Sequence, residues 1–145
     1  PGGHLLNGYL LDTNIISDLI RNPTGLAACR IAKENPKTLF TSVIVAAELR
    51  YGCAKKGSAR LLERVESVLN IIPVLPLDVP ADGEYGGIRA ELEAAGQSIG
   101  LNDLLIVAHA YTLKLTLVTD NTREFCRIRG LKVENWLEAA PRVRA

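Results

Sequence analysis

Four acidic residues of the 145-residue sequence occupy positions where carboxylates can meet and do chemistry. Asp12 and Asp120 each follow a short apolar run, in YLLDTN and TLVTDN, while Glu48 and Asp103 lie among apolar neighbours. Carboxylates brought together repel one another unless a cation lies between them. A hard dication such as Mg²⁺ prefers oxygen ligands and accompanies phosphate-bearing substrates. The four acids therefore indicate metal-assisted hydrolysis of a phosphodiester, with an activated water as the nucleophile.

Each acid also has a structural interpretation that the sequence leaves open. Asp12 could form an Asx turn or cap a helix, and Asp120 could merely precede a cap, because NTRE from Asn121 has capping-box spacing. Glu48 could reach solvent from the edge of a helix, and Asp103 could offset a helix dipole. The metal-site interpretation rests on the joint pattern of the four acids along the chain.

The elements that would position these acids alternate between short apolar strands and amphipathic helices. Strands are expected at 9–11, 39–41, 71–75, 115–119 and near 133, and helices at 15–20, 24–34, 43–53, 55–69, 80–95, 102–111 and 122–128. Thr24, Ser42 and Asn102 are expected to open three of these helices. Strands that are apolar throughout predict an α/β fold with a mostly parallel sheet covered on both faces. Ligands in such folds bind beyond the carboxyl ends of the strands, where Asp12 and Asp120 would lie.

The length and composition predict one domain over residues 1–145, with residues 1–7 a flexible or non-native end and 138–145 a loose tail. No apolar run approaches the roughly 20 residues of a membrane helix, so no membrane association is expected. The start of the chain has no signal-peptide pattern. Three widely spaced cysteines, without metal or disulfide spacing, indicate the cytoplasm.

The net charge of +1 conceals an uneven distribution. Between residues 78 and 103, six acids accompany one arginine, whereas residues 121–145 contain six bases and three acids. An acidic cluster beside a basic end fits a metal site next to a polyanion, and it also fits a solvated surface. The basic residues that would follow an RNA backbone, or else form a solvated face, are Arg123, Arg127, Arg129 and Lys132.

Four stretches of the sequence resemble the PIN domain and, within it, the VapC-type toxins of bacterial toxin–antitoxin pairs. They span about residues 10–137 and read LLDTNIIS, TSVIVAAELRYG, IRAELEAAGQSIGLNDLLIVAHA and LVTDNTREFCRIRGLKVENWL. Two short segments depart from the family pattern: Leu101-Asn102 stands where small residues are usual, and Gly96-Gln97-Ser98 replaces Gly-x-Pro. Neither departure changes an acid.

The resemblance implies a three-layer α/β/α fold around a mostly parallel sheet and an endoribonuclease that depends on Mg²⁺ or Mn²⁺. Asp12, Glu48 and Asp103 match the three core acidic ligands of the family, and Asp120 matches the fourth. Thr13 and Asn14 match the small polar residues that orient the first aspartate, and Thr119 is expected to do likewise.

The resemblance also implies a substrate and partners. The NWL and TREF segments resemble the toxins that cut tRNA, including initiator tRNA at the anticodon. Such toxins are homodimers, each held by an antitoxin whose tail covers the acidic site. Tyr51 and Trp136 would then stack on a base, or pack in the core or an interface, and Arg50 and Tyr51 would face a partner.

The histidine content excludes one ribonuclease chemistry. Attack by a 2′-hydroxyl needs two placed imidazoles, whereas His4 is in the expected tail and His109 is expected to be packed or on the surface. The sequence instead predicts in-line attack by water, which leaves a 5′-phosphate and a 3′-hydroxyl. A PIN-domain RNA-processing nuclease that is not a toxin, and a non-catalytic α/β binding module, are the alternatives.

Overall fold

The computed structural model describes residues 7–139, and its centre is a five-stranded sheet in which every neighbouring pair is parallel. The strand order is β3-β2-β1-β4-β5. The strands are β1 (Tyr9–Leu11), β2 (Leu39–Ser42), β3 (Val74–Leu75), β4 (Thr116–Val118) and β5 (Val133–Glu134). The predicted parallel sheet is confirmed.

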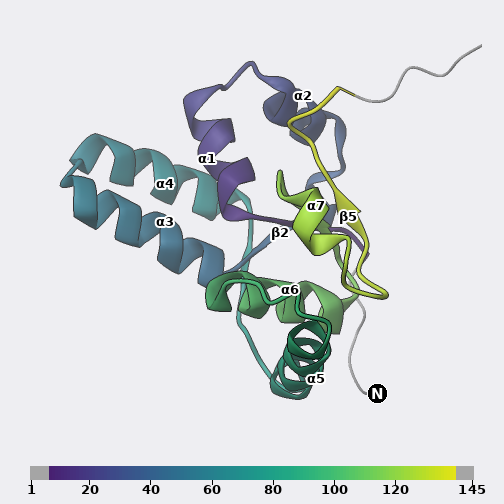
Figure 1. Cartoon of the computed structure of the whole chain (residues 1–145). Helices are drawn as coiled ribbons and strands as arrows, with labels where there is room; N and C mark the ends of the chain where they lie inside the picture. The colour runs from purple at the N-terminus through teal and green to yellow at the C-terminus, as the bar shows by residue number, and fades with distance from the viewer. Residues whose placement is uncertain (1–6, 140–145) are drawn as a thin grey trace, which may run out of the picture.

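Helices cover both faces of this sheet and give the α/β/α arrangement. They are α1 (Thr13–Arg21), α2 (Leu26–Lys33), α3 (Val43–Lys56), α4 (Ala59–Ile71), α5 (Ala81–Ala94), α6 (Leu101–Leu113) and α7 (Thr122–Phe125), with a 3₁₀ turn at Pro36–Thr38. In Figure 1, α1 and α2 lie on one side of the strands and α5 and α6 on the other, while the α3–α4 pair projects sideways. No helix in the described residues is long and apolar enough to cross a membrane.

The two central strands are buried on both faces, which explains their unbroken apolar sequences. Leu10 and Leu11 of β1 pair in register with Leu117 and Val118 of β4, and all four are fully buried. The pairing continues one residue further, because the Asp12 amide donates to the Val118 carbonyl at 2.9 Å. The chain segments that carry Asp12 and Asp120 therefore leave the sheet side by side, as the parallel pattern predicted.

Several predicted boundaries were wrong for reasons of backbone geometry. Helix α4 begins at Ala59 rather than Lys55, because Gly57 adopts a left-handed conformation (φ 63°) that ends α3, and Ser58 caps α4. The strand predicted at 71–75 is only Val74–Leu75, since α4 continues through Ile71.

Two of the three predicted helix caps were also wrong. Helix α2 begins after Gly25, so Thr24 does not cap it, and α6 begins after Gly100, which places Asn102 inside its first turn. Neither glycine offers a side-chain oxygen to the helix. Ser42 does cap α3 as predicted, because its hydroxyl oxygen accepts from the Ile44 amide at 3.0 Å.

Candidate active site

Asp12 lies at the junction of β1 and α1, where it is only 5% exposed. Its Oδ1 accepts from the Thr13 amide and its Oδ2 accepts from the Thr119 hydroxyl, both at 2.8 Å. Burial raises the pKa of Asp12 above its ordinary value, these two hydrogen bonds oppose the rise, and the charges of Glu48 and Asp120 add to it. Asp12 thus caps α1, and it is also a buried acid whose charged form a bound cation would stabilise.

The two residues after Asp12 connect it to other acids. The Thr13 hydroxyl donates to Glu48 Oε1 at 2.8 Å, and the Asn14 side-chain amide donates to Asp120 Oδ1 at 2.8 Å. Both side chains were expected to orient Asp12, and the structure places their hydrogen bonds on its neighbours instead. One turn of chain therefore fixes carboxylates that come from α3 and from the end of β4.

Asp103 occupies the first turn of α6 and is half-buried. Burial, together with the nearby charges of Asp12, Glu48 and Glu124, raises the pKa of Asp103 to about 6. The carboxylates predicted from the sequence thus lie close enough to act on one another. They come from four parts of the fold: the end of β1, α3, α6 and the end of β4.

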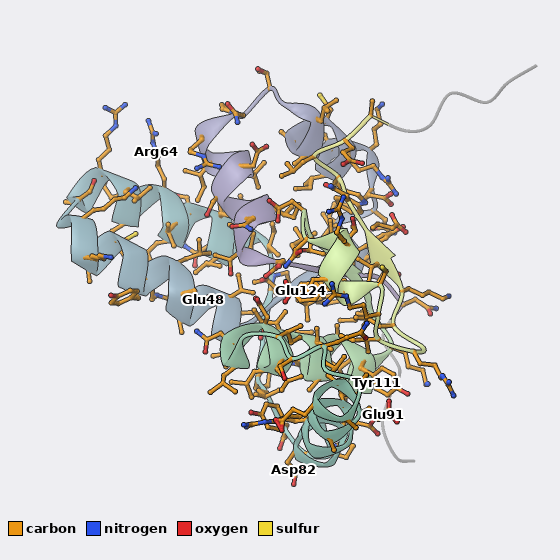
Figure 2. All side chains as sticks on the ribbon, in the orientation of Figure 1. Glu48, Arg64, Asp82, Glu91, Tyr111 and Glu124 are labelled. Atoms are coloured by element: carbon orange, nitrogen blue, oxygen red, sulfur yellow. The ribbon has the colours of Figure 1, made fainter. Side chains whose placement is uncertain are left out.

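Glu124 on α7 is a fifth acid at this site, and the sequence interpretation assigned it only to a capping box. That box is wrong, because the Asn121 side chain accepts no bond from the helix and its Nδ2 instead donates to the Glu124 carboxylate, while its backbone amide donates to the Thr119 hydroxyl. Its position one helical turn after Asp120 was the signal that could have identified it. In Figure 2, Glu48 and Glu124 lie in the middle of the molecule, far from Arg64 on the outer part of α4.

None of the five acids forms an ion pair with a basic side chain of the described residues, since the four ion pairs found there involve other acids. In that part of the chain, no three His, Cys, Asp or Glu side chains lie close enough to hold an ion directly as they stand. Mg²⁺ usually binds through one or two carboxylates and keeps several waters. The donor set, all oxygen and unbalanced in charge, therefore fits a hydrated dication.

The other candidate residues lie in different surroundings. His109 is buried, with its Nδ1 2.8 Å from the Ser42 hydroxyl, and burial lowers its pKa, so it does not serve the acids; His4 lies outside the described residues. Trp136 is 2% exposed beneath Arg30, so it belongs to the core, whereas Tyr51 on α3 is 67% exposed. The four predicted RNA-binding residues are all exposed: Arg123, Arg127, Arg129 and Lys132.

Comparison with known proteins identifies the family to which this arrangement belongs. A model of the PIN domain matches residues 9–131. The chain belongs to the PIN-domain family. Within it, the chain is 39% identical over 132 residues to Ribonuclease VapC2 of Rickettsia felis, covering 88% of this chain and 97% of that protein. It therefore belongs to the VapC ribonucleases.

Two further members of the VapC family carry information about substrate and assembly. The chain is 38% identical over 129 residues to a protein of Shigella flexneri named tRNA(fMet)-specific endonuclease VapC, covering 88% of this chain and 97% of that one. The crystal structure of DNA-bound VapBC from Salmonella typhimurium superposes with a TM-score of 0.83 at 36% identity, covering 90% and 99% of the two chains.

Proposed function

We propose that this protein is the endoribonuclease toxin of a toxin–antitoxin pair and that the acidic cluster is its metal centre. The observation that supports this most strongly is the gathering of Asp12, Glu48, Asp103 and Asp120, with Glu124, around the ends of β1 and β4. Asp12 is buried, Glu48, Asp103 and Glu124 are half-buried and Asp120 is exposed. Like charges gathered around a buried acid, without a basic side chain paired to them, are unfavourable unless a cation binds among them. Membership of the VapC ribonucleases supports RNA hydrolysis as the reaction that such a cation would serve.

The residues of the chain prepare this centre by holding the acids in place. Thr119 and the Thr13 amide fix both oxygens of Asp12, Thr13 holds Glu48, and Asn14 holds Asp120. A Mg²⁺ or Mn²⁺ held by these acids would polarise a phosphoryl oxygen and activate water. Because His109 is buried and bonded to Ser42 rather than placed among the acids, we propose that water attacks the phosphodiester, so that the products carry a 5′-phosphate and a 3′-hydroxyl.

The proposed substrate is tRNA, and the proposed partners are an antitoxin and a second copy of the chain. The name of the Shigella flexneri relative supports initiator tRNA as the substrate, and the Salmonella typhimurium complex supports an antitoxin partner. The exposed Tyr51 on α3 offers an apolar contact to such a partner, whereas Arg50 beside it pairs with Glu66 at 2.8 Å. We place the protein in the cytoplasm, where both tRNA and antitoxin are made.

The experiment is to incubate the protein with bulk bacterial tRNA and Mg²⁺ and to map the ends of the fragments. We expect one tRNA species cut in its anticodon loop, with 5′-phosphate ends. Uniform degradation of all species would favour a general PIN-domain nuclease, and ends with 2′,3′-cyclic phosphate would contradict the proposed chemistry. Intact tRNA after incubation, with Mn²⁺ as well as Mg²⁺, would leave the binding-module alternative.

A further inference from the structure

A hollow of about 240 Å³ lies between the end of α5 and the turn that follows α7. Its lining combines an apolar floor with polar groups: Ile88, Leu92 and Ile128 on the floor, and Gln97, Arg127 and Arg129 above them. The three floor residues are each less than 9% exposed, so the floor is part of the core and only its outer atoms reach the hollow. Such a lining suits a small, flat, partly apolar group that carries negative charge.

Short segments of chain, which form two walls, connect the hollow to the acidic cluster on two sides. One wall runs from Gln97 through Gly100, where a Cβ would be 3.6 Å from Asp103 Oδ2, to Asp103 itself. The other wall runs from Glu124 on α7 to Arg127, three residues later. The charge of Glu124 acts on Asp103, and Gln97 and Arg127 line the same hollow, so the two walls lie near each other at both ends. Because three residues span at most about 11 Å, Arg127 at the hollow lies within that distance of Glu124.

Both walls are held in shape before any ligand binds. Gln97 follows a left-handed Gly96 (φ 67°), and its amide donates to the Leu92 carbonyl at 2.8 Å. On the other wall, Gly130 (φ 82°) packs against Tyr111, where a Cβ would approach the ring to 3.2 Å. Figure 2 shows Tyr111 of α6 and Glu91 of α5 close to each other. A preformed hollow loses little conformational entropy when it binds a ligand.

The charges at the hollow favour a phosphate-bearing group. Neither Arg127 nor Arg129 is in any of the four ion pairs found in the described part of the chain, and both are exposed. Glu91 contributes one carboxylate to the same lining, so the two guanidinium groups exceed it by one charge. Arginine suits this role because its planar fork binds phosphate oxygens in pairs.

We propose that this hollow binds a nucleotide that flanks the cleaved phosphate, with its base on the apolar floor and its phosphate at Arg127 and Arg129. The inference rests on the proposed ribonuclease function. The four exposed basic residues then have different roles. Arg127 and Arg129 form the subsite, whereas Arg123 and Lys132 are not in its lining. Bases splayed out of single-stranded loops stack on aromatic rings or guanidinium planes and are hydrogen-bonded at their edges. The two arginines and Gln97 of this lining can make such contacts beside the apolar floor.

The test measures binding of fluorescently labelled bulk bacterial tRNA at several KCl concentrations, in an Asp12→Asn background that prevents cleavage. We expect the double variant Arg127→Gln/Arg129→Gln to raise Kd about tenfold and to reduce the slope of log K against log salt by about 1.4, at roughly 0.7 per lost phosphate contact. Ala95→Trp, which fills the hollow without changing charge, should also raise Kd. Glu91→Gln should lower Kd, because it removes the repelling charge.

The matched control is Arg60→Gln/Arg64→Gln on exposed positions of α4, which removes the same charge from residues outside the lining of the hollow. Figure 2 shows Arg64 well away from Glu48 and Glu124. The control should leave Kd near the background value. A subsite double variant that matches this control, or an Ala95→Trp variant that binds normally, overturns the inference. The proposed function is judged separately by cleavage with unsubstituted protein: cleavage with normal binding by the variants removes only the subsite, whereas tRNA that is neither bound nor cleaved removes both.

Discussion

Asp12 shows how one residue can serve the fold and the site together. Its carbonyl accepts from the Ile15 and Ile16 amides at the start of α1, and its side chain accepts from Thr13 and Thr119. The helix-cap interpretation and the metal-site interpretation of this residue are therefore compatible, because the cap is what turns the carboxylate toward the other acids. An asparagine at this position would keep an acceptor for the Thr13 amide while losing the charge.

The raised pKa of Asp103 predicts how stability depends on pH without a metal. Folding favours the protonated acid, so its stabilising effect is complete below the ordinary pKa of 3.8 and is lost as pH rises through about 6. For a half-exposed group, solvent screening reduces the change to about 1 kcal/mol. Urea unfolding at several pH values in EDTA should show this loss of stability. The Asp103→Asn variant should lack the part of the pH dependence that Asp103 causes. Asp82→Asn, on an exposed position of α5, should retain the full dependence; identical curves for the two variants would contradict the assignment.

At the scale of elements, the parallel sheet accounts for what could be predicted. Asp12 and Asp120 follow strands that are fully apolar, and neighbouring parallel strands end at one edge, so their proximity followed from the pattern. The start of α6 and the break between α3 and α4 depend on backbone conformation at Gly100 and Gly57, which apolar spacing does not report. Glu124 was missed because a local cap explained it without any distant contact.

The cap of α3 links the core to the site. Ser42 accepts from the Ile44 amide and lies 2.8 Å from His109 Nδ1, and the helix that it begins carries Glu48. The Nε2 atom of His109 makes no hydrogen bond of normal geometry among the described residues, although an interaction with the Pro76 backbone opposes the effect of burial on the pKa of the ring. Loss of the Ser42 hydroxyl would therefore leave the buried imidazole with neither nitrogen bonded to a side chain.

Ser42→Ala should consequently destabilise the protein by about 2 kcal/mol, of which about 1 comes from the cap and the rest from the buried histidine. Because Glu48 shifts with the helix, cleavage should fall about tenfold. Ser58→Ala removes the matching cap of α4, a helix without a site acid, and should reduce stability by about 1 kcal/mol only. Chemical unfolding and cleavage rates on both variants test this, and equal losses of activity would show that α3 has no special role.

At the scale of the whole molecule, the sheet and the helices together position the acidic cluster. The sheet brings two strand ends together, α3 and α6 each add an acid, and α7 adds Glu124. Arg127 and Arg129, which follow α7, line the hollow. The match to the PIN domain over residues 9–131 includes all five acids. The assignment to this family therefore rests on the whole domain and not on one short motif. Of the predicted flexible ends, residues 1–6 and 140–145 lie outside the described residues, and the flexibility of both ends stays a prediction.

The most direct test of the central claim is the rate of tRNA cleavage as a function of Mn²⁺ concentration, for the unsubstituted protein and for Asp12→Asn. We predict no cleavage in EDTA, a rate that saturates as Mn²⁺ is added, and a rate reduced about a hundredfold or more in Asp12→Asn, because loss of a group that merely supports a metal ligand already costs 10–100-fold. Circular dichroism should show that the variant is folded. Cleavage that persists in EDTA, or an Asp12→Asn variant that cleaves at the unsubstituted rate, would contradict the account.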